Sequence, residues 1–336
     1  MRTREFAGTQ VGAVGLGCMG MSWAYTESER DDDASVTLIR EAVDLGVTFL
    51  DTAQPYGDGH NETIVGRALK GRRDEAVLAT KTGLVVEDEA SWNLVRNGTP
   101  AHVKASAEDS LRRLGTDVID LYYLHRVDPD VPLAESWGAM AELVAEGKVR
   151  RLGLSEVTVA QAAEAHAIHP VAAIQSELSL WTRDALGAPG GIAGTAPGHA
   201  AGTGEGPGDV VAWCAANGAA FVPYSPLGRG FLTGAVTSAD FEDTDFRGVN
   251  PRFQEDALKA NLRIVDVVRS VAGRRGATPA QVAIAWTLAQ GEHVIPIPGT
   301  KKQRYLHDNA GAADLDLTEG DLAELDDVPA AVGGRY

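Results

Sequence analysis

The chain has 336 residues, 44% of them hydrophobic and 23% charged, a composition typical of a globular protein with a large core. Its net charge of −17 disfavours nucleic acid and anionic membrane surfaces as partners, because both are themselves negatively charged. No run approaches the ~20 consecutive apolar residues that cross a bilayer, and the charged first residues do not resemble a secretion signal. Cys18 and Cys214, the only cysteines, indicate a reducing cytoplasmic location without a disulfide framework or a zinc site.

Eight short apolar runs follow one another along the chain, with helical patterns between them. Most of these runs lack alternation, as expected for parallel strands that are covered by helices outside and packed together inside. Helical spacing is visible in Ser35–Leu45 and Pro100–Leu114, and Thr278 followed by proline begins a further helix. The alternation predicts a single (β/α)8 TIM-barrel domain over residues 1–336. The expected strands are Ala13–Leu16, Thr48–Leu50, Ala76–Thr80, Ile119–Leu124, Val149–Leu154, Ala172–Gln175, Ala220–Pro223 and Val294–Ile297.

Three segments do not fit this alternation. Thr3–Val11 is interpreted as a β-hairpin that plugs the end of the barrel away from the active site. Residues 187–208, after the sixth strand, are rich in glycine and contain little to bury, so we expect a mobile insertion. This insertion is either a lid over the site or, by default, an inert loop. Gly234–Glu255, after the seventh strand, is irregular and rich in aspartate and phenylalanine.

Proton-handling residues follow three consecutive strands. Asp51 and Tyr56 stand in FLDTAQPYG, Lys81 in ATKTG and His125 in LYYLH. The exits of barrel strands converge on one face, so these four side chains are expected to meet in one active site.

The four residue types suit the polarisation of a carbonyl group. A phenol keeps its proton at neutral pH, so Tyr56 can donate it to a developing alkoxide. The Lys81 ammonium can stabilise the resulting phenolate, and Asp51 can hold that lysine in place. His125 can orient the substrate oxygen. Each residue alone has a commoner structural explanation, but the combination on consecutive strands favours a catalytic site.

The last two strand exits provide a place for an electron donor. Tyr224 in VPYSPLGRG offers a flat face, followed by glycines that allow close backbone approach. Gly299 and Thr300 lead into a helix that begins with Lys301 and Lys302, and such a helix start binds phosphate.

The four histidines His60, His102, His166 and His169 fall on loops or helices, which disfavours a metal-dependent hydrolase.

Seven ordered phrases between about Val11 and Asp327 resemble the aldo-keto reductases, in a branch similar to pyridoxal-reductase-like enzymes. They are FLDTAQPYG, ATKTG, LYYLHRVDP, GKVRRLGLSE, AIQSELSLWTRD, YSPLGRGFLTG and PGTKKQRYLHDN. The resemblance implies reduction of an aldehyde or ketone by NADPH, with Asp51, Tyr56, Lys81 and His125 as the catalytic tetrad. It implies no Rossmann domain, and the sequence contains no suitably placed G-x-G-x-x-G.

The resemblance also assigns a cofactor site. Ser155 and Gln175 would bind the nicotinamide carboxamide, and Tyr224 would stack on its ring. The pyrophosphate would lie against Ser225, Leu227, Gly228, Gly230 and Arg252. The adenosine 2′-phosphate would be bound near Gly299 by Thr300, Lys301 and Lys302, and the adenine by Asp308 and Asn309. Cys18 and Met19, at the first strand exit, would contact the cofactor mainly through the backbone.

The sequence departs from the family pattern at several of these positions. Glu156 and Ser176 replace asparagines found in many members, Asp308 replaces the usual glutamate, and Tyr305 replaces an arginine. The aromatic residues expected on the substrate rim are Trp23, Tyr25, Trp92 and Trp181. They suit many carbonyl compounds and select none, and the oligomeric state is not indicated.

The alternative function is that of a cofactor-sensing binding protein, like the beta subunits of voltage-gated potassium channels.

Overall fold

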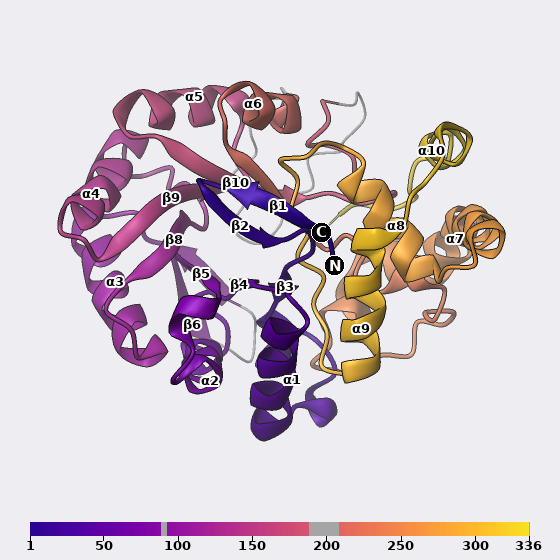
Figure 1. Cartoon of the computed structure of the whole chain (residues 1–336), viewed down its shortest axis with the longest axis horizontal. Helices are drawn as coiled ribbons and strands as arrows, with labels where there is room; N and C mark the ends of the chain where they lie inside the picture. The colour runs from indigo at the N-terminus through magenta and orange to yellow at the C-terminus, as the bar shows by residue number, and fades with distance from the viewer. Residues whose placement is uncertain (89–92, 188–207, 336) are drawn as a thin grey trace.

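The computed structural model describes residues 1–88, 93–187 and 208–335. A barrel of parallel strands lies at its centre, surrounded by helices (Figure 1). The strands are β3 (Leu16–Gly17), β4 (Phe49–Asp51), β5 (Val77–Thr82), β8 (Ile119–Leu124), β9 (Val149–Ser155), β10 (Val171–Glu177) and β11 (Ala220–Tyr224). Their order in the sheet is β11-β10-β9-β8-β5-β4-β3, which confirms the predicted barrel.

The eighth position of the barrel is filled by an extended segment from His293 to Gly299 rather than by a regular strand. On one side, the Phe221 amide donates to the His293 carbonyl at 2.9 Å. On the other, the Gly15 amide donates to the Pro296 carbonyl at 2.8 Å. Pro296 and a second proline two residues later have no N–H to donate, so the ladder is interrupted although the barrel closes.

The first strand is shorter than its apolar run suggested, since β3 holds only the last residue of the expected Ala13–Leu16 and the glycine after it. Ala13 is instead tied to the start of the chain, because its amide donates to the Arg2 carbonyl at 2.9 Å. The backbone here therefore connects the hairpin to the barrel before it joins the sheet.

The helices cover the outside of the barrel. Three of them begin at threonine caps with capping boxes, at Thr158, Thr278 and Thr318, which explains where these helices start. The helices are α1 (Asp32–Asp44), α2 (His60–Leu69), α3 (Pro100–Leu114), α4 (Leu133–Ala145), α5 (Val159–Ile168), α6 (Val210–Ala216), α7 (Glu255–Arg275), α8 (Pro279–Leu288), α9 (Gln303–Gly311) and α10 (Glu319–Asp326).

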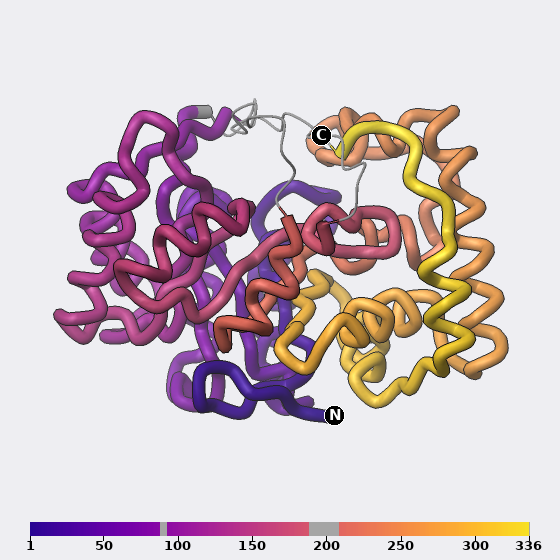
Figure 2. Tube along the Cα trace, turned by 90° about the horizontal axis from the view of Figure 1, so that it is seen from above, coloured from indigo at the N-terminus to yellow at the C-terminus, as the bar shows by residue number. Residues whose placement is uncertain are grey.

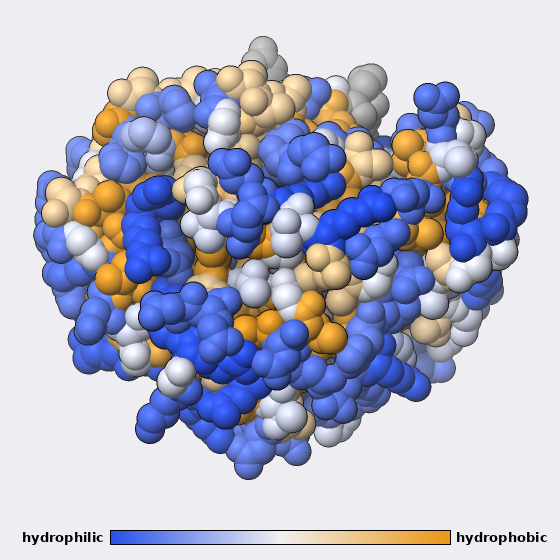
Figure 3. Space-filling view, in the orientation of Figure 1, coloured by the Kyte–Doolittle hydropathy of each residue, from blue (hydrophilic) through white to orange (hydrophobic). Residues whose placement is uncertain are grey.

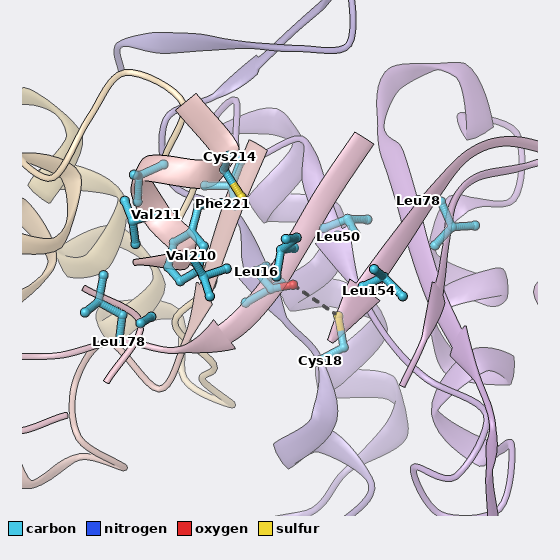
Figure 4. Packing of buried hydrophobic residues seen from close by; sticks show 14 of the residues in the cluster. Leu16, Cys18, Leu50, Leu78, Leu154, Leu178, Val210, Val211, Cys214 and Phe221 are labelled. Atoms are coloured by element: carbon cyan, nitrogen blue, oxygen red, sulfur yellow. Dashed lines mark hydrogen bonds between the residues drawn. The ribbon is translucent and has the colours of Figure 1, made fainter. Parts of the chain in front are cut away.

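The layer between strands and helices forms the largest hydrophobic core. Figure 4 shows part of it, where Leu16 and Leu50 from the sheet lie in one cluster with Val210 and Cys214 of α6. Both cysteines are free thiols buried in this layer. Burial on both faces of most strands explains why their sequences show no alternation.

The predicted N-terminal hairpin is confirmed. Strands β1 (Thr3–Phe6) and β2 (Thr9–Gly12) pair antiparallel across one end of the barrel (Figure 1). Phe6 and Val11 belong to the cluster that fills the barrel interior, and the Phe6 ring meets Phe49 edge-on at 5.4 Å. The molecular surface on this face is mostly hydrophilic (Figure 3). The hairpin thus closes the end opposite the strand exits.

A second hairpin stands at the other end of the barrel, where β6 (Leu84–Asp88) and β7 (Asn93–Arg96) pair antiparallel directly after β5. Its residues Leu84 and Leu94 lie beside the strand exits and line the cavity described below.

Phe6→Ala is expected to lower the free energy of unfolding by about 3–5 kcal/mol, because it removes a ring that fills the end of the barrel. Denaturant unfolding measures this change. Glu5→Ala, at the exposed neighbouring position, is the control and should change stability by less than about 0.5 kcal/mol. Equal stability of the two variants would contradict the plug.

Candidate active site

Four side chains from successive strand exits meet at one end of the barrel. Asp51 is the last residue of β4, Lys81 lies in β5, His125 directly follows β8, and Tyr56 stands on the turn after β4. All four are buried, Lys81 completely. The parallel strands thus place them together as the sequence predicted.

The Lys81 ammonium is the centre of the cluster. It donates to Asp51 Oδ1 at 2.5 Å, to the Thr52 carbonyl at 2.9 Å and to the Tyr56 hydroxyl at 3.2 Å. An ammonium has three N–H groups, so each has a partner. The other oxygen of Asp51 accepts from Gln175 Nε2 at 2.7 Å. The three contacts hold the Lys81 ammonium beside the phenol.

Charge and burial act in opposite directions on this cluster. Burial alone would lower the pKa of Lys81, but the Asp51 carboxylate and Tyr56 outweigh it and raise that pKa, so the lysine stays protonated. Burial raises the pKa of Tyr56, opposed by the nearby Lys81 charge. The phenol therefore holds its proton at neutral pH, beside the cation that would stabilise the phenolate.

His125 lies across the cluster, with its ring edge-on to the Tyr56 ring at 5.9 Å. Burial, assisted by the positive charges of Arg126 and Lys81, lowers the pKa of His125 well below its usual 6.5. The imidazole is therefore neutral at neutral pH. Its Nδ1 atom is buried and has no hydrogen-bond partner among the described residues.

The turn that carries Tyr56 is held by buried polar contacts. The Thr52 hydroxyl donates to Asn61 Oδ1 at 2.7 Å, and Asn61 Nδ2 donates to the Cys18 carbonyl at 2.9 Å. Gly57, Asp58 and Gly59 all have positive φ, the backbone that glycine tolerates best. The tyrosine is thus presented on a tight turn anchored to α2 and to the first strand exit.

A cavity of about 510 Å³ opens over this cluster and extends to the start of α9. Tyr56, Asp51 and His125 line one end of it, whereas Lys81 lies behind its wall. Of the residues expected from sequence in the cofactor and rim sets, those on the cavity wall are Met19, Trp23, Tyr25, Ser155, Gln175, Tyr224, Ser225, Leu227, Gly230, Gly299, Thr300, Lys301 and Lys302.

The end of the cavity near α9 carries two lysines. Lys301 Nζ donates to the carbonyls of Tyr25 and Thr26 at 2.9 and 2.7 Å, and Lys302 Nζ pairs with Glu29 at 2.7 Å. Burial lowers the pKa of Lys301. The pair provides positive charge at a helix start, which is suited to an anion.

Left-handed backbone is concentrated around this cavity. Of the seven non-glycine residues with positive φ in the described part of the chain, four line the cavity, namely Ala24, Thr26, Ser225 and Arg229. Such conformations cost free energy and are typical of ligand-binding turns.

Two residues expected at the substrate rim and the cofactor site lie outside the cavity wall. Trp181 does not border the cavity, because its indole is 4% exposed and stacks on Phe231 at 4.5 Å, within the core. Arg252 is also outside the cavity wall. Its guanidinium donates to Thr182 Oγ1 at 2.6 Å and lies over the Trp181 ring at 5.3 Å. Both residues pack behind the loops that form the cavity wall.

Four further residues expected to contact a cofactor are outside the wall. Cys18 is fully buried. Gly228 lies against the Trp181 ring, and a side chain at this position would collide with that ring. Asp308 accepts from Thr278 Oγ1 at 2.9 Å at the start of α8, and Asn309 is buried. Trp92 and residues 188–207 of the insertion expected at 187–208 lie outside the described residues.

The sequence did not single out several residues that the structure places on the cavity wall. Arg126 follows His125 and donates to Ser155 Oγ at 3.1 Å. Arg229, Phe246 and Arg247 reach the wall from loops after β11. The arginine in LYYLHR could have been found from its place directly after a strand-exit histidine. The loop residues have no comparable signal, because their placement depends on the tertiary fold.

Two structural properties bear on the class of protein. Among residues 1–88, 93–187 and 208–335, none of the helices combines the length and apolar character that crossing a bilayer requires. The same residues contain no group of three or more His, Cys, Asp or Glu side chains arranged to hold a metal ion.

Comparison with known proteins gives consistent matches over almost the whole chain. A model of the Aldo/keto reductase family matches residues 13–330. A probable aldo-keto reductase of Glycine max is 40% identical over 98% of this chain and 89% of its own length. The structure of a glycerol dehydrogenase from Gluconobacter oxydans matches with a TM-score of 0.82 at 31% identity, covering 97% of this chain and 94% of that one. An aldo/keto reductase from Klebsiella pneumoniae, solved with NADP and acetate, matches with a TM-score of 0.69 at 29% identity, covering 96% and 94% of the two chains.

The buried neutral imidazole predicts a pH dependence of stability. Because the pKa of His125 is lowered by folding, the unfolded chain binds an extra proton as the pH falls below about 6.5. Stability should therefore decrease toward lower pH, with His125 contributing up to about 1.4 kcal/mol per pH unit. His125→Gln should flatten the slope between pH 6.5 and 5, measured by denaturant unfolding. An unchanged slope in His125→Gln would contradict the burial argument.

Proposed function

Because the chain belongs to the aldo/keto reductase family, we propose that it reduces an aldehyde or ketone to the alcohol with NADPH. The observation that carries this proposal is the buried Lys81 ammonium, which joins Asp51 to the Tyr56 hydroxyl at the end of a large cavity. This arrangement suits proton donation to a carbonyl oxygen.

The cavity residues fit the nicotinamide half of this cofactor. Tyr224 offers an aromatic face on the cavity wall, close to the strand exits that carry Ser155 and Gln175. We assign the tyrosine to stacking and the two polar side chains to the carboxamide. Gln175 also donates to Asp51, so it would join the cofactor site to the catalytic cluster.

The phosphate half is supported by the opposite end of the cavity. Lys301 and Lys302 stand at the start of α9, and the Ser225–Gly230 turn brings backbone close to the cavity. The complex of the Klebsiella pneumoniae relative with NADP supports the same cofactor here. We assign the lysines to the 2′-phosphate and the turn to the pyrophosphate. The local positive charge would offset the repulsion of an anionic cofactor by the acidic chain.

When bound, NADPH supplies a hydride to the carbonyl carbon. Tyr56 donates its hydroxyl proton to the carbonyl oxygen, and the Lys81 ammonium stabilises the phenolate that remains. Asp51 keeps that ammonium charged and aimed at the phenol. Neutral His125, which lines the cavity beside Tyr56, orients the carbonyl oxygen. The two buried free thiols support the proposal that this chemistry takes place in the reducing cytoplasm.

Tyr56→Phe is expected to lower kcat for aldehyde reduction by about 10²–10⁴-fold, because it removes the proton donor, while NADPH affinity stays near the wild-type value. Cofactor oxidation over a panel of aldehydes, together with fluorescence titration of NADPH, measures both quantities. Tyr122→Phe, at a buried tyrosine outside the cavity wall, is the matched control and should keep wild-type turnover. Full activity in Tyr56→Phe would overturn the assigned role. Tight NADPH binding by the wild type with no turnover of any carbonyl would favour a cofactor-sensing protein instead.

Lys302→Met is expected to weaken NADPH binding by about tenfold and to leave NADH binding nearly unchanged, because only NADPH carries the 2′-phosphate. Titration of each nucleotide measures the ratio of the two dissociation constants. Lys259→Met removes an exposed lysine from α7 and serves as the control. Equal losses for the two nucleotides would assign Lys302 a role other than 2′-phosphate recognition.

A further inference from the structure

The segment that follows α10 runs back to the strand-exit end of the barrel, opposite the β1–β2 hairpin (Figure 2). Buried asparagines hold it there. Asn261 of α7 exchanges two hydrogen bonds with the Val332 backbone, at 3.0 and 2.8 Å. Asn250 Nδ2 donates to the Arg335 carbonyl at 2.9 Å. The backbone of Arg335 is thus fixed beside the candidate active site.

The Arg335 side chain lies among three carboxylates, two of which are buried. It pairs with Glu156, with Glu177 at 3.4 Å and with Asp184 at 3.6 Å. The Arg335 side chain is only 10% exposed, and those of Glu156 and Glu177 are 9% and 1% exposed. Buried carboxylates need a cation, and Arg335 offers a planar fork that can serve two of them at once.

Glu156 connects this arginine to the wall of the cavity. One carboxylate oxygen pairs with Arg335. The other accepts from the Tyr224 hydroxyl at 2.9 Å and from the Glu177 amide at 3.0 Å. Tyr224, in turn, presents its ring to the cavity. The contacts form a chain from Arg335 through Glu156 to the proposed nicotinamide platform.

The backbone of Glu156 supports a specific role for this contact. Its φ of +54° is left-handed, a conformation that glutamate adopts at a cost. The residue directly follows Ser155, the end of β9, and its amide donates to the Gln175 carbonyl at 3.0 Å. The strained position therefore places the carboxylate between two strand exits of the cavity.

Resting on the proposed function, we propose that Arg335 is a positioning residue for cofactor binding, acting on Tyr224 through Glu156. The arginine neutralises and orients the Glu156 carboxylate, which then holds the Tyr224 hydroxyl so that the ring lies ready to stack on the nicotinamide. Holding the ring in place before binding removes an ordering cost that the cofactor would otherwise bear.

A double-mutant cycle on NADPH affinity tests this proposal. Fluorescence titration gives the dissociation constant for the wild type, Arg335→Met, Tyr224→Phe and the double variant. Arg335→Met is expected to weaken NADPH binding by about threefold to tenfold. In the Tyr224→Phe background the same change should have less than about a twofold effect, because the hydroxyl that transmits it is absent. The proposal would be overturned if the loss of affinity in the double variant equalled the product of the losses in the two single variants. It would also be overturned if Arg335→Met kept the wild-type affinity and only lowered the melting temperature.

Two further variants sharpen the result. Glu156→Gln combined with Arg335→Met removes both charges and leaves an acceptor for Tyr224, so its NADPH affinity should return to within about twofold of the wild type. An affinity as weak as that of Arg335→Met would count against the proposal. Arg263→Met, an exposed change on α7, is the control for loss of one positive charge.

The cycle remains usable when Arg335→Met does not fold. Arg335→Lys then replaces it, because a lysine cannot bond Glu156 and Glu177 with a planar fork. Its smaller loss of affinity should again disappear in the Tyr224→Phe background, and an additive loss would overturn the proposal. A wild-type chain that does not bind NADPH would refute the proposed function itself, whereas normal wild-type binding with an additive cycle refutes only the role of Arg335.

Discussion

A fully buried ammonium is the constraint on which this structure depends. Lys81 has no exposed surface, and a charge in such a place is stable only when its N–H groups find strong acceptors. Asp51, the Thr52 carbonyl and the Tyr56 hydroxyl provide them. These acceptors come from the neighbouring strand exit and the turn after it, so the cluster forms only when β4 and β5 are in register within the barrel. The candidate catalytic cluster therefore depends directly on correct folding of the barrel.

The same principle recurs at the other side of the cavity. Glu156 and Glu177 are buried carboxylates, and their cations Arg229 and Arg335 come from a loop after β11 and from the segment after α10. Buried charges thus tie distant parts of the chain to the rim of the barrel. Removing one partner of such a pair would leave a buried charge uncompensated, which is strongly destabilising.

Much of this architecture could be predicted from the sequence, for identifiable reasons. Buried parallel strands are short and apolar, so the runs ending at Asp51, Lys81 and His125 were visible without an alignment. The chain direction fixes which end of a parallel strand is its exit, and the four catalytic candidates were placed together on that ground. The closing segment was also predicted, at Val294–Ile297, although the sequence analysis did not anticipate that Pro296 and its neighbouring proline interrupt the ladder there.

By itself, then, the sequence determined the barrel, its hairpin plug and the set of residues at strand exits, because these follow from local periodicity and chain direction. Only the tertiary structure decided which side chains reach the cavity. Trp181 and Arg252 share the polar or aromatic character of cavity residues, yet packing against Phe231 and Thr182 turns both away. Arg335 is adjacent to no motif, and it reaches Glu156, 179 positions earlier, because the folded chain returns to the strand exits. Contacts of that sequence separation depend on how the whole chain folds back on itself, which no local pattern encodes.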